Sequence, residues 1–431
     1  MLVDDLNESF QVPTPPRADN QMQVGAQGSA RTLHRSAKRN RVRAMKIVDV
    51  AEYYSEGGGG IRTYIQAKMR AGAKRGHEVV VVAPGRENHE EEKYGGRIIW
   101  LKGPAMPFDD RYGVMWNMKA VHRVLDAEAP DVVEGSSVWM GGQFAGRWKG
   151  DAVKTLIFHQ DPVAVGAHTF FDRYVSRGRI DGLLSPVWAY LRSVSRKYDA
   201  TIVAGEWLGE RLRSFSVHNP VAVPFGIDKA VFSPSRRSAA KRRELLATCG
   251  LGEDAALLLT VSRFHPEKRL GTLFETVRRL QSIRPVGLVV YGAGYLSKKV
   301  RRLAEECPQI VLAGYTKDRE ELATIYASAD ALLHGSAAET FGLGVAEAVC
   351  SGLPCIAPSV GGAADLVSEA SGSLYEPGDV TGCMNATLDL LERPREPIVA
   401  ACATRAERIN TVDGHFAQLF ETYQALIDAR R

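Results

Sequence analysis

The sequence predicts an α/β protein with two doubly wound, parallel-sheet domains, and three observations carry this prediction. Short runs of β-branched residues alternate with helical segments from Met45 onward, which is typical of βαβ units and parallel sheets. The same alternation begins again near residue 257, which indicates a second domain of the same kind. The length of 431 residues fits two domains, since a domain usually takes about 100 to 200 residues.

The first half of the chain supplies strands as short β-branched runs separated by longer segments. The expected strands include KIVDV (46–50), EVVVVAP (78–84), RIIWL (97–101), DVVEG (131–135), KTLIFH (154–159), ATIVAG (200–205) and VAVPFG (221–226). Helices are expected between them, including 62–75, 117–128 and 186–197.

The second half repeats this pattern and then changes to helices. Its expected strands are LLLTVSRF (257–264), VGLVVYGAG (286–294), QIVLAGY (309–315), DALLHGS (330–336) and LPCIAPS (353–359). From about residue 378 the chain reads as helices only, and it ends in the amphipathic stretch DGHFAQLFETYQALIDARR. We expect this last helix to pack back on the N-terminal domain, because an amphipathic helix needs a folded surface to cover its apolar face.

Composition also sets the expected domain boundaries. The first 44 residues are rich in Pro, Gln, Asn, Ser and Arg without an apolar period, so a disordered leader is expected. Its basic end is usually a solvated tail, with a docking or membrane role as the alternative; Met45 as the real start is a third interpretation. The joint between domains falls in FGIDKAVFSPSRR, where Gly, Pro and Ser cluster. The predicted parts are a leader (1–44), an acceptor-side domain (45–226), a donor-side domain (227–405) and a C-terminal helix (406–431).

The overall composition excludes several classes of protein. Apolar residues make up 45% and charged residues 24%, which is the balance of a soluble globular protein. A net charge of +5 is too mild to require nucleic acid, but it fits anionic small molecules or an anionic membrane surface. The six cysteines show neither a C-x-x-C pair nor a zinc-type spacing, so reduced core thiols are expected. Without an apolar span or a secretory signal, the cytoplasm is the expected compartment.

The segment ETFGLGVAEA places Glu339 and Glu347 on either side of a glycine-bearing turn from strand to helix. Gly342 and Gly344 would let backbone amides approach a phosphate or a sugar hydroxyl at a helix N-terminus. The two carboxylates can accept hydrogen bonds from sugar and ribose hydroxyls. Taken alone, two glutamates at this spacing are more often an ordinary helix residue and a surface residue.

A second motif changes that balance. In VSRFHPEKRLGTLFETV, Arg263 and Lys268 follow a strand and precede a helix. Two cations at the carboxyl edge of a parallel sheet are well placed to hold a pyrophosphate and to stabilise its charge as a glycosidic bond breaks. Two solvated surface cations are the plainer interpretation of this motif by itself.

With these motifs in order, residues 45–431 resemble the family 4 glycosyltransferases, which are retaining enzymes with the GT-B fold. The resemblance also rests on YGAG, AGYTKDRE, FGIDKAVFSP and GGGGIRTYIQAKMRAGAKRGHEV. It implies that Arg263 and Lys268 bind the donor diphosphate, Glu339 the transferred sugar and Glu347 the nucleotide ribose. It also implies that the amides of Phe341, Gly342 and Leu343 face the sugar, and that the loop around Tyr315 and Lys317 meets the base. Asp365 stands where the family often has Glu, and His334-Gly335 where Pro is frequent.

The first domain offers two further candidates. Gly59 and Gly60 open a helix after a strand and a loop, where backbone amides could approach the donor phosphate or the acceptor; a merely flexible loop is the alternative. His159 ends the strand TLIFH, and the family places a functional His or acidic residue there. Its expected role is to position the donor sugar rather than to act as a nucleophile. A purely structural histidine is the alternative.

The resemblance implies transfer of a hexosyl unit from a UDP- or GDP-linked sugar to an acceptor hydroxyl, with retention. No D-x-D triplet is present, so no metal and no cofactor are expected, and the cationic role falls to Arg263 and Lys268. The expected partners are a nucleotide sugar and a glycan or glycolipid acceptor, without nucleic acid. A GT-B epimerase or phosphorylase, and a catalytically silent nucleotide-sugar-binding protein, are the alternatives.

The segment 166–200 mixes aromatic and apolar residues with arginines. Such a mixture can sit at a lipid interface, which would make the protein a peripheral enzyme acting on a lipid-linked acceptor at the cytoplasmic leaflet. The alternative is that the apolar residues pack inward and the cations form a solvated face.

Overall fold

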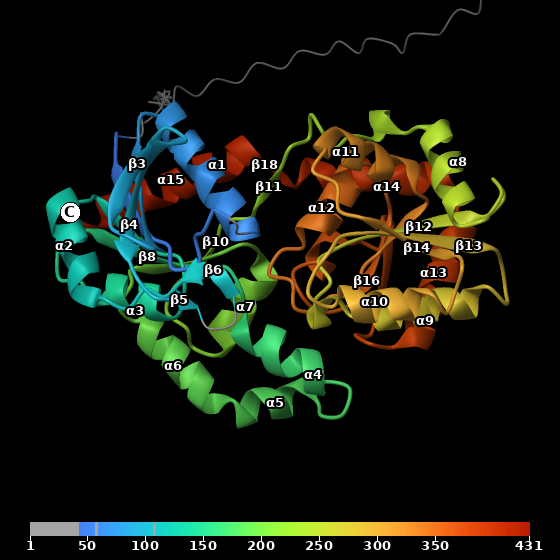
Figure 1. Ribbon diagram of the computed structural model, residues 1–431, viewed down its shortest axis with the longest axis horizontal. Coiled ribbons are helices and arrows are strands. Elements are labelled where there is room, and N and C mark those ends of the chain that lie inside the picture. Colours follow the sequence, from blue (N-terminus) through green and yellow to red (C-terminus); the bar gives the residue numbers. More distant parts are fainter. Residues whose placement is uncertain (1–42, 57–58, 107–108) are drawn as a thin grey trace, which may run out of the picture. The chain divides into compact units, whose positions relative to one another are not determined.

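The computed structural model describes residues 43–56, 59–106 and 109–431, and these residues form two large β-sheets with helices on both faces (Figure 1). The predicted leader lies outside the described residues except for Arg43 and Ala44. The predicted α/β architecture with two parallel sheets is therefore confirmed.

The first sheet has eight strands in the order β10-β9-β8-β7-β1-β2-β4-β3. From β1 the chain moves to one side through β2, and later returns to the other side through β7. Neighbours pair in parallel, except that β3 pairs antiparallel with β4. The strands are β1 (Lys46–Val50), β2 (Glu78–Gly85), β3 (His89–Lys93), β4 (Gly96–Lys102), β7 (Val132–Gly135), β8 (Val153–Phe158), β9 (Ala200–Val203) and β10 (Pro220–Ala222).

Helices connect the strands of this sheet, and three of them lie over the ranges 62–75, 117–128 and 186–197 that the sequence predicts. The connecting helices are α1 (Gly60–Lys74), α2 (Met118–Glu128), α3 (Met140–Arg147), α4 (Thr169–Phe171), α5 (Arg177–Leu183), α6 (Ser185–Ser195) and α7 (Glu206–Ser214). A π-helical turn, Ala164–His168, leads into α4, and a small antiparallel pair joins β5 (Ala105–Met106) to β6 (Asp109–Gly113). The run Val79–Ala83 is buried throughout, as expected for a central parallel strand that is covered on both faces.

The second sheet has six parallel strands in the order β14-β13-β12-β15-β16-β17. They are β12 (Ala256–Val261), β13 (Val286–Tyr291), β14 (Ile310–Gly314), β15 (Ala331–Leu333), β16 (Cys355–Pro358) and β17 (Gly372–Tyr375). The helices are α8 (Ala239–Thr248), α9 (Leu270–Leu280), α10 (Ser297–Ala304), α11 (Arg319–Ser328), α12 (Leu343–Cys350), α13 (Val380–Glu392) and α14 (Arg395–Glu407). All six cysteines are free and buried in this half.

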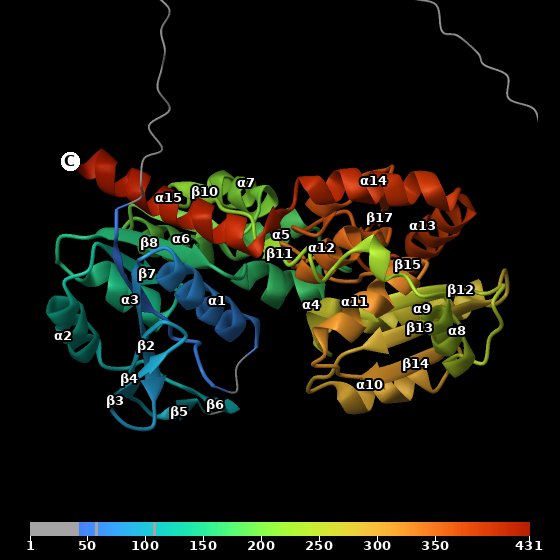
Figure 2. The ribbon, with the colours of Figure 1, turned by 90° about the horizontal axis from the view of Figure 1, so that it is seen from above.

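The chain crosses between the two sheets twice, and the two crossings lie side by side. β11 (Gly226–Ile227) pairs in parallel with β18 (Asn410–Thr411), which directly precedes α15 (Val412–Arg430). Figures 1 and 2 both show α15 beside α1, and Phe416, Leu419 and Phe420 are buried in the apolar cluster of the first sheet. The predicted return of the last helix to the N-terminal domain is confirmed. The predicted strand 221–226 is wrong at its end, because Val223–Phe225 lie between β10 and β11 without strand structure.

A group of buried charges lies inside the first domain. Lys68 of α1 donates to Asp49 of β1 at 2.6 Å and also to Glu134 of β7. Tyr423 of α15 donates its hydroxyl hydrogen bond to the same Glu134. All three charged side chains are completely shielded from solvent. The ion pairs replace the water that these charges lose on burial, and each charge would be unfavourable there without its partner.

None of the helices formed by the described residues combines the length and the apolar content that a membrane span requires.

Candidate active site

The second sheet has a topological switch between β12 and β15. These strands are parallel neighbours, but the chain leaves β12 toward β13 and β14 on one side, and leaves β15 toward β16 and β17 on the other. The loops at the carboxyl ends of such a strand pair diverge and form a crevice, which is where open α/β sheets bind ligands. Lys268 follows β12, and Glu339 follows β15.

The structure brings Lys268 and Glu339 together at this point. Lys268 Nζ lies 2.5 Å from Glu339 Oε1 and 3.1 Å from Glu267 Oε1. Burial alone would raise the pKa of Glu339, but the nearby Lys268 charge, with His334, holds it down to about 2. Burial likewise opposes the charge on Lys268, yet Glu339 and Glu267 raise its pKa. Both groups are therefore charged at neutral pH.

Arg263 lies nearby but faces solvent. Its side chain is 71% exposed, and its Nη2 lies 3.4 Å from Glu267 Oε1. Glu267 is buried and joins Arg263 to Lys268, although the sequence analysis did not single it out. The available indication was that Glu267 directly precedes Lys268 in the sequence.

Glu347 belongs to a separate group with Tyr326 and Arg319. The Tyr326 hydroxyl donates to Glu347 Oε2 at 3.4 Å, and Arg319 Nη2 lies 3.9 Å from Oε1. Burial raises the pKa of Glu347 to about 7, because these two partners only partly offset the loss of water. Sequence reasoning missed Arg319, which starts α11 just beyond the predicted base-contact loop. In that loop, Tyr315 and Lys317 are exposed.

The turn before α12 has the conformation that the glycine motif predicts. Gly342 has φ +91, and a Cβ there would lie 2.9 Å from Ala363 Cα, so a larger residue would be strained and crowded. The Phe341 ring is buried and meets the Phe225 ring edge-on at 5.7 Å. Leu343, the first residue of α12, is exposed.

His159 comes from the first sheet and lies against this region of the second domain. Its carbonyl oxygen accepts a hydrogen bond from Thr340 Oγ1 at 3.2 Å, directly beside Glu339. Its ring meets the Tyr64 ring edge-on at 5.4 Å, and its Nε2 has no hydrogen-bond partner among the described residues. Burial lowers the pKa of His159 to about 4, so the imidazole is neutral at pH 7.

Gly59, Gly60 and His334 are the remaining residues that the sequence motifs brought forward. Gly60 begins α1. A Cβ built on Gly59 or Gly60 would meet no atom of another part of the chain within 4 Å, so there is space for a ligand beside this backbone. Gly57 and Gly58 lie outside the described residues. His334, noted in the sequence only as a departure, points its Nε2 toward Glu339 Oε1 at 3.7 Å, and burial lowers its pKa to about 4.

Comparison with known proteins matches both halves of the chain to glycosyltransferase families. Residues 58–231 match the model described as "Glycosyltransferase Family 4", and residues 241–408 match "Glycosyl transferases group 1". The chain belongs to the family 4 glycosyltransferases. The GT-B fold and the glycosyltransferase activity that the sequence resemblance implied are thereby confirmed.

Individual relatives of this glycosyltransferase agree with that assignment. A sulfoquinovosyl transferase of Arabidopsis thaliana is 28% identical, with 80% of this chain and 66% of the relative covered. A GDP-mannose-dependent alpha-(1-6)-phosphatidylinositol dimannoside mannosyltransferase of Mycobacterium tuberculosis is 26% identical, with 90% of this chain and 98% of the relative covered. The solved structure of sucrose-phosphate synthase from Thermosynechococcus elongatus has a TM-score of 0.69 at 20% identity, covering 90% of this chain and all of that one, so it shows the shared fold.

Segment 166–200 of the glycosyltransferase only partly matches the predicted mixed surface. Trp188 and Leu191 are buried, and the Trp188 ring stacks on Phe215 at 3.8 Å. For these two residues the alternative given for this segment holds, because they pack inward in the domain core. Between residues 170 and 183, the exposed aromatic, leucine and arginine side chains are Phe170, Phe171, Arg173, Tyr174, Arg179 and Leu183, which we call the aromatic-basic patch.

Proposed function

We propose that this glycosyltransferase moves a hexosyl unit from a nucleoside diphosphate sugar to a hydroxyl of a lipid-linked acceptor, with retention of configuration and without a metal. The observation that carries the proposal is the Lys268–Glu339 ion pair at the topological switch, with His159 beside it across Thr340. It supplies a fixed cation and a fixed acceptor of hydrogen bonds within one site.

Lys268 and Arg263 would hold the donor diphosphate and stabilise its charge as it leaves. A positioned cation contributes most where negative charge develops in the transition state, and it makes a bound metal unnecessary for that role. Arg263 is exposed and so is free to turn toward a phosphate, whereas Lys268 is already fixed.

Glu339, His159 and Glu347 would orient the donor. Glu339 stays ionised, with a pKa of about 2, so it accepts hydrogen bonds from sugar hydroxyls and does not act as a general acid. The unpartnered Nε2 of the neutral His159 can bond a sugar hydroxyl. Glu347 would accept from the ribose, and the amides of Phe341, Gly342 and Leu343 would face the sugar. Retention fits a site in which the acceptor enters on the face that the diphosphate leaves.

The donor can be identified directly. The mycobacterial relative is named as GDP-mannose-dependent, so GDP-mannose is the first donor to test, beside UDP-glucose and ADP-glucose. We expect one of these to raise the melting temperature and then to give a transfer product by mass spectrometry. Donor consumption without an acceptor, or only with inorganic phosphate, would instead support an epimerase or a phosphorylase. Binding without any turnover would support a silent binding protein.

Binding of the donor is expected to depend on pH through Glu347. Its pKa of about 7 means that the carboxyl is mostly protonated at pH 6 and mostly ionised at pH 8. Ribose hydroxyls donate to the ionised form, so affinity for GDP-mannose should rise about tenfold from pH 6 to pH 8. GDP-mannose suits this test because its diester phosphates do not titrate in this range. Calorimetric titration of Glu347→Gln should show a flat profile, and an equal rise in the variant would contradict the ribose role.

The aromatic-basic patch leads us to propose that the enzyme works at an anionic membrane surface. Phe170, Phe171, Tyr174 and Leu183 are each more than half exposed, and Arg173 stacks on the Tyr174 ring at 4.4 Å. Aromatic side chains insert at the lipid interface, and each basic residue there adds about 1 kcal/mol of attraction to anionic lipid. The name of the mycobacterial relative includes a phosphatidylinositol dimannoside, a lipid that fits this location.

Co-sedimentation with liposomes tests the patch. The protein should bind phosphatidylglycerol liposomes at low salt, bind them less at high salt and bind phosphatidylcholine liposomes weakly. The double variant Phe170→Ser/Phe171→Ser should lose most of this binding, whereas Tyr295→Ser, which changes an exposed aromatic residue of the second domain, should keep it. Failure to bind anionic liposomes at low salt would favour a soluble acceptor.

A further inference from the structure

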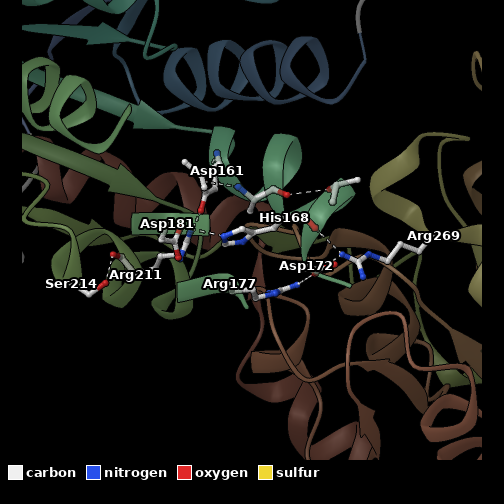
Figure 3. Close-up of polar contacts among 11 residues, drawn as sticks. Asp161, His168, Asp172, Arg177, Asp181, Arg211, Ser214 and Arg269 are labelled. Carbon is white, nitrogen blue, oxygen red and sulfur yellow. Dashed lines mark hydrogen bonds and ion pairs between the residues drawn. The ribbon is translucent and has the colours of Figure 1, made fainter. Parts of the chain in front are cut away.

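Asp172, at the end of α4, lies between two arginines that come from different domains (Figure 3). Arg177 Nη2 donates to Asp172 Oδ2 at 2.8 Å, and Arg269 Nη2 donates to the same oxygen at 2.6 Å. The Asp172 side chain is 6% exposed and that of Arg269 is 11% exposed. Water screens the attraction between these shielded charges less than in a surface pair, and separating them would leave each buried without its counter-charge, so the pair can hold two segments in a fixed relation.

Arg269 directly follows Lys268 and has an unusual backbone. Its φ of +47 lies in the left-handed region, between the 3-10 turn Pro266–Lys268 and the start of α9. A side chain with a Cβ is disfavoured there, whereas glycine adopts it freely. The arginine side chain explains the choice of residue, because it reaches Asp172 and the carbonyl oxygen of His168 at 3.4 Å.

The segment that carries Asp172 is itself fixed by a network of buried charges, drawn in Figure 3. Asp161 Oδ1 accepts from the amide of Val163 at 2.8 Å, and its Oδ2 accepts from Arg211 Nε at 2.5 Å. Arg211 also bonds Asp181 at 2.8 Å, and Asp181 lies 3.2 Å from His168 Nε2. A path of ionic and hydrogen-bonded contacts therefore runs from Asp161, two residues beyond His159, to His168, whose carbonyl oxygen accepts from the amide of Asp172 at 3.2 Å.

We propose that Asp172 is a positioning residue for sugar transfer. Through its ion pair with Arg269 it fixes the turn that carries Lys268, so that the acceptor-side segment and the cation on the donor diphosphate are set in place together. When the acceptor-side segment is displaced, Arg269 loses its partner and Lys268 loses its exact orientation toward Glu339. The inference rests on the proposed role of Lys268. It adds that the segment proposed to meet the acceptor and the lysine proposed to bind the donor are joined through the Asp172–Arg269 ion pair.

Two variants test this connection, with GDP-mannose as donor and phosphatidylinositol liposomes as acceptor. Asp172→Asn should lower kcat about tenfold and change the KM for GDP-mannose less than about threefold, because the loss lies in the transition state rather than in ground-state binding. Arg269→Gly should lower kcat to the same extent, although it relieves the left-handed strain. If Arg269 served the turn alone, glycine would preserve activity.

A matched control is Asp365→Ala. Asp365 Oδ2 accepts from the amide of Trp207 at 3.0 Å, so it too joins the two domains, but it does not contact the Lys268 turn. Its kcat should stay within about twofold of the wild type. Hydrogen–deuterium exchange should rise over residues 264–272 in Asp172→Asn and remain unchanged there in Asp365→Ala.

Three results would overturn the proposal. These are kcat within about twofold of wild type in both Asp172→Asn and Arg269→Gly, an equal loss in Asp365→Ala, and unchanged exchange over 264–272 in Asp172→Asn. The exchange measurement needs no turnover. If the wild type transfers no sugar from any donor, the proposed function fails separately, and exchange alone decides whether Asp172 holds the Lys268 turn.

Discussion

Replacing Lys268 with alanine is expected to lower kcat for sugar transfer by about a hundredfold to a thousandfold. The loss of one preorganised group that stabilises developing charge usually has an effect of this size. Lys268 is held 2.5 Å from Glu339 and is largely buried, so water cannot replace it as well as it replaces an exposed cation. Steady-state kinetics and mass spectrometry of the product measure the effect.

The control for this experiment is Lys298→Ala, which removes an exposed lysine from α10 in the same domain. It should retain wild-type transfer. Circular dichroism should show that both variants remain folded, because Lys268 lies at the carboxyl edge of the sheet rather than in an apolar cluster. A folded Lys268→Ala enzyme with kcat within about twofold of wild type would remove the basis for the donor-site assignment.

The largest effect on stability is expected from Lys68→Ala. This change leaves the carboxylates of Asp49 and Glu134 buried without their cation, and both are fully shielded from water. Removing one partner of a buried ionic group usually lowers the free energy of unfolding by about 3–5 kcal/mol. Urea denaturation followed by circular dichroism measures the change in unfolding free energy.

Lys74→Ala provides the comparison, since Lys74 lies on the same helix and pairs with Asp413 at 3.4 Å on the surface. A surface ion pair contributes at most about 1 kcal/mol, so this variant should unfold almost as the wild type does. Combining Lys68→Met with Asp49→Asn and Glu134→Gln should restore part of the lost stability, because no unpaired charge then remains. Equal stability of Lys68→Ala and Lys74→Ala would contradict the role assigned to the buried group.

The central strands and the helices between them were predictable because burial on both faces leaves a β-branched run in the sequence. β3 was not, because its residues HEEEK show no apolar pattern. It forms as an edge strand beside β4 through a two-residue turn in which Tyr94 has φ +56 and Gly95 has φ +79. A two-residue turn of this kind joins the strands of a β-hairpin, so Gly95 was the residue that indicated a hairpin here.

In the candidate site, too, some residues could be predicted from the sequence and some contacts could not. Lys268 and Glu339 were predictable because each lies in a local motif at the end of a strand, and strand order brings them together. Whether they perform the proposed roles stays a prediction. The contact of Asp172 with Arg269 could not be predicted, since it joins residues 97 positions apart that share no motif. Which side chains of segment 166–200 are exposed could not be predicted either, because Trp188 packs on Phe215, which comes directly after the later helix α7.

The side-by-side crossings at β11 and β18 decide how this protein can be dissected. The chain enters the second domain after β11 and leaves it before β18, so a single continuous fragment between them contains the whole six-stranded sheet. The other domain is discontinuous, because α15 fills its apolar surface with Phe416, Leu419 and Phe420 from the far end of the chain. A fragment ending near residue 226 would expose that surface and should aggregate, whereas the same fragment fused through a short linker to residues 410–431 should fold as an independent unit.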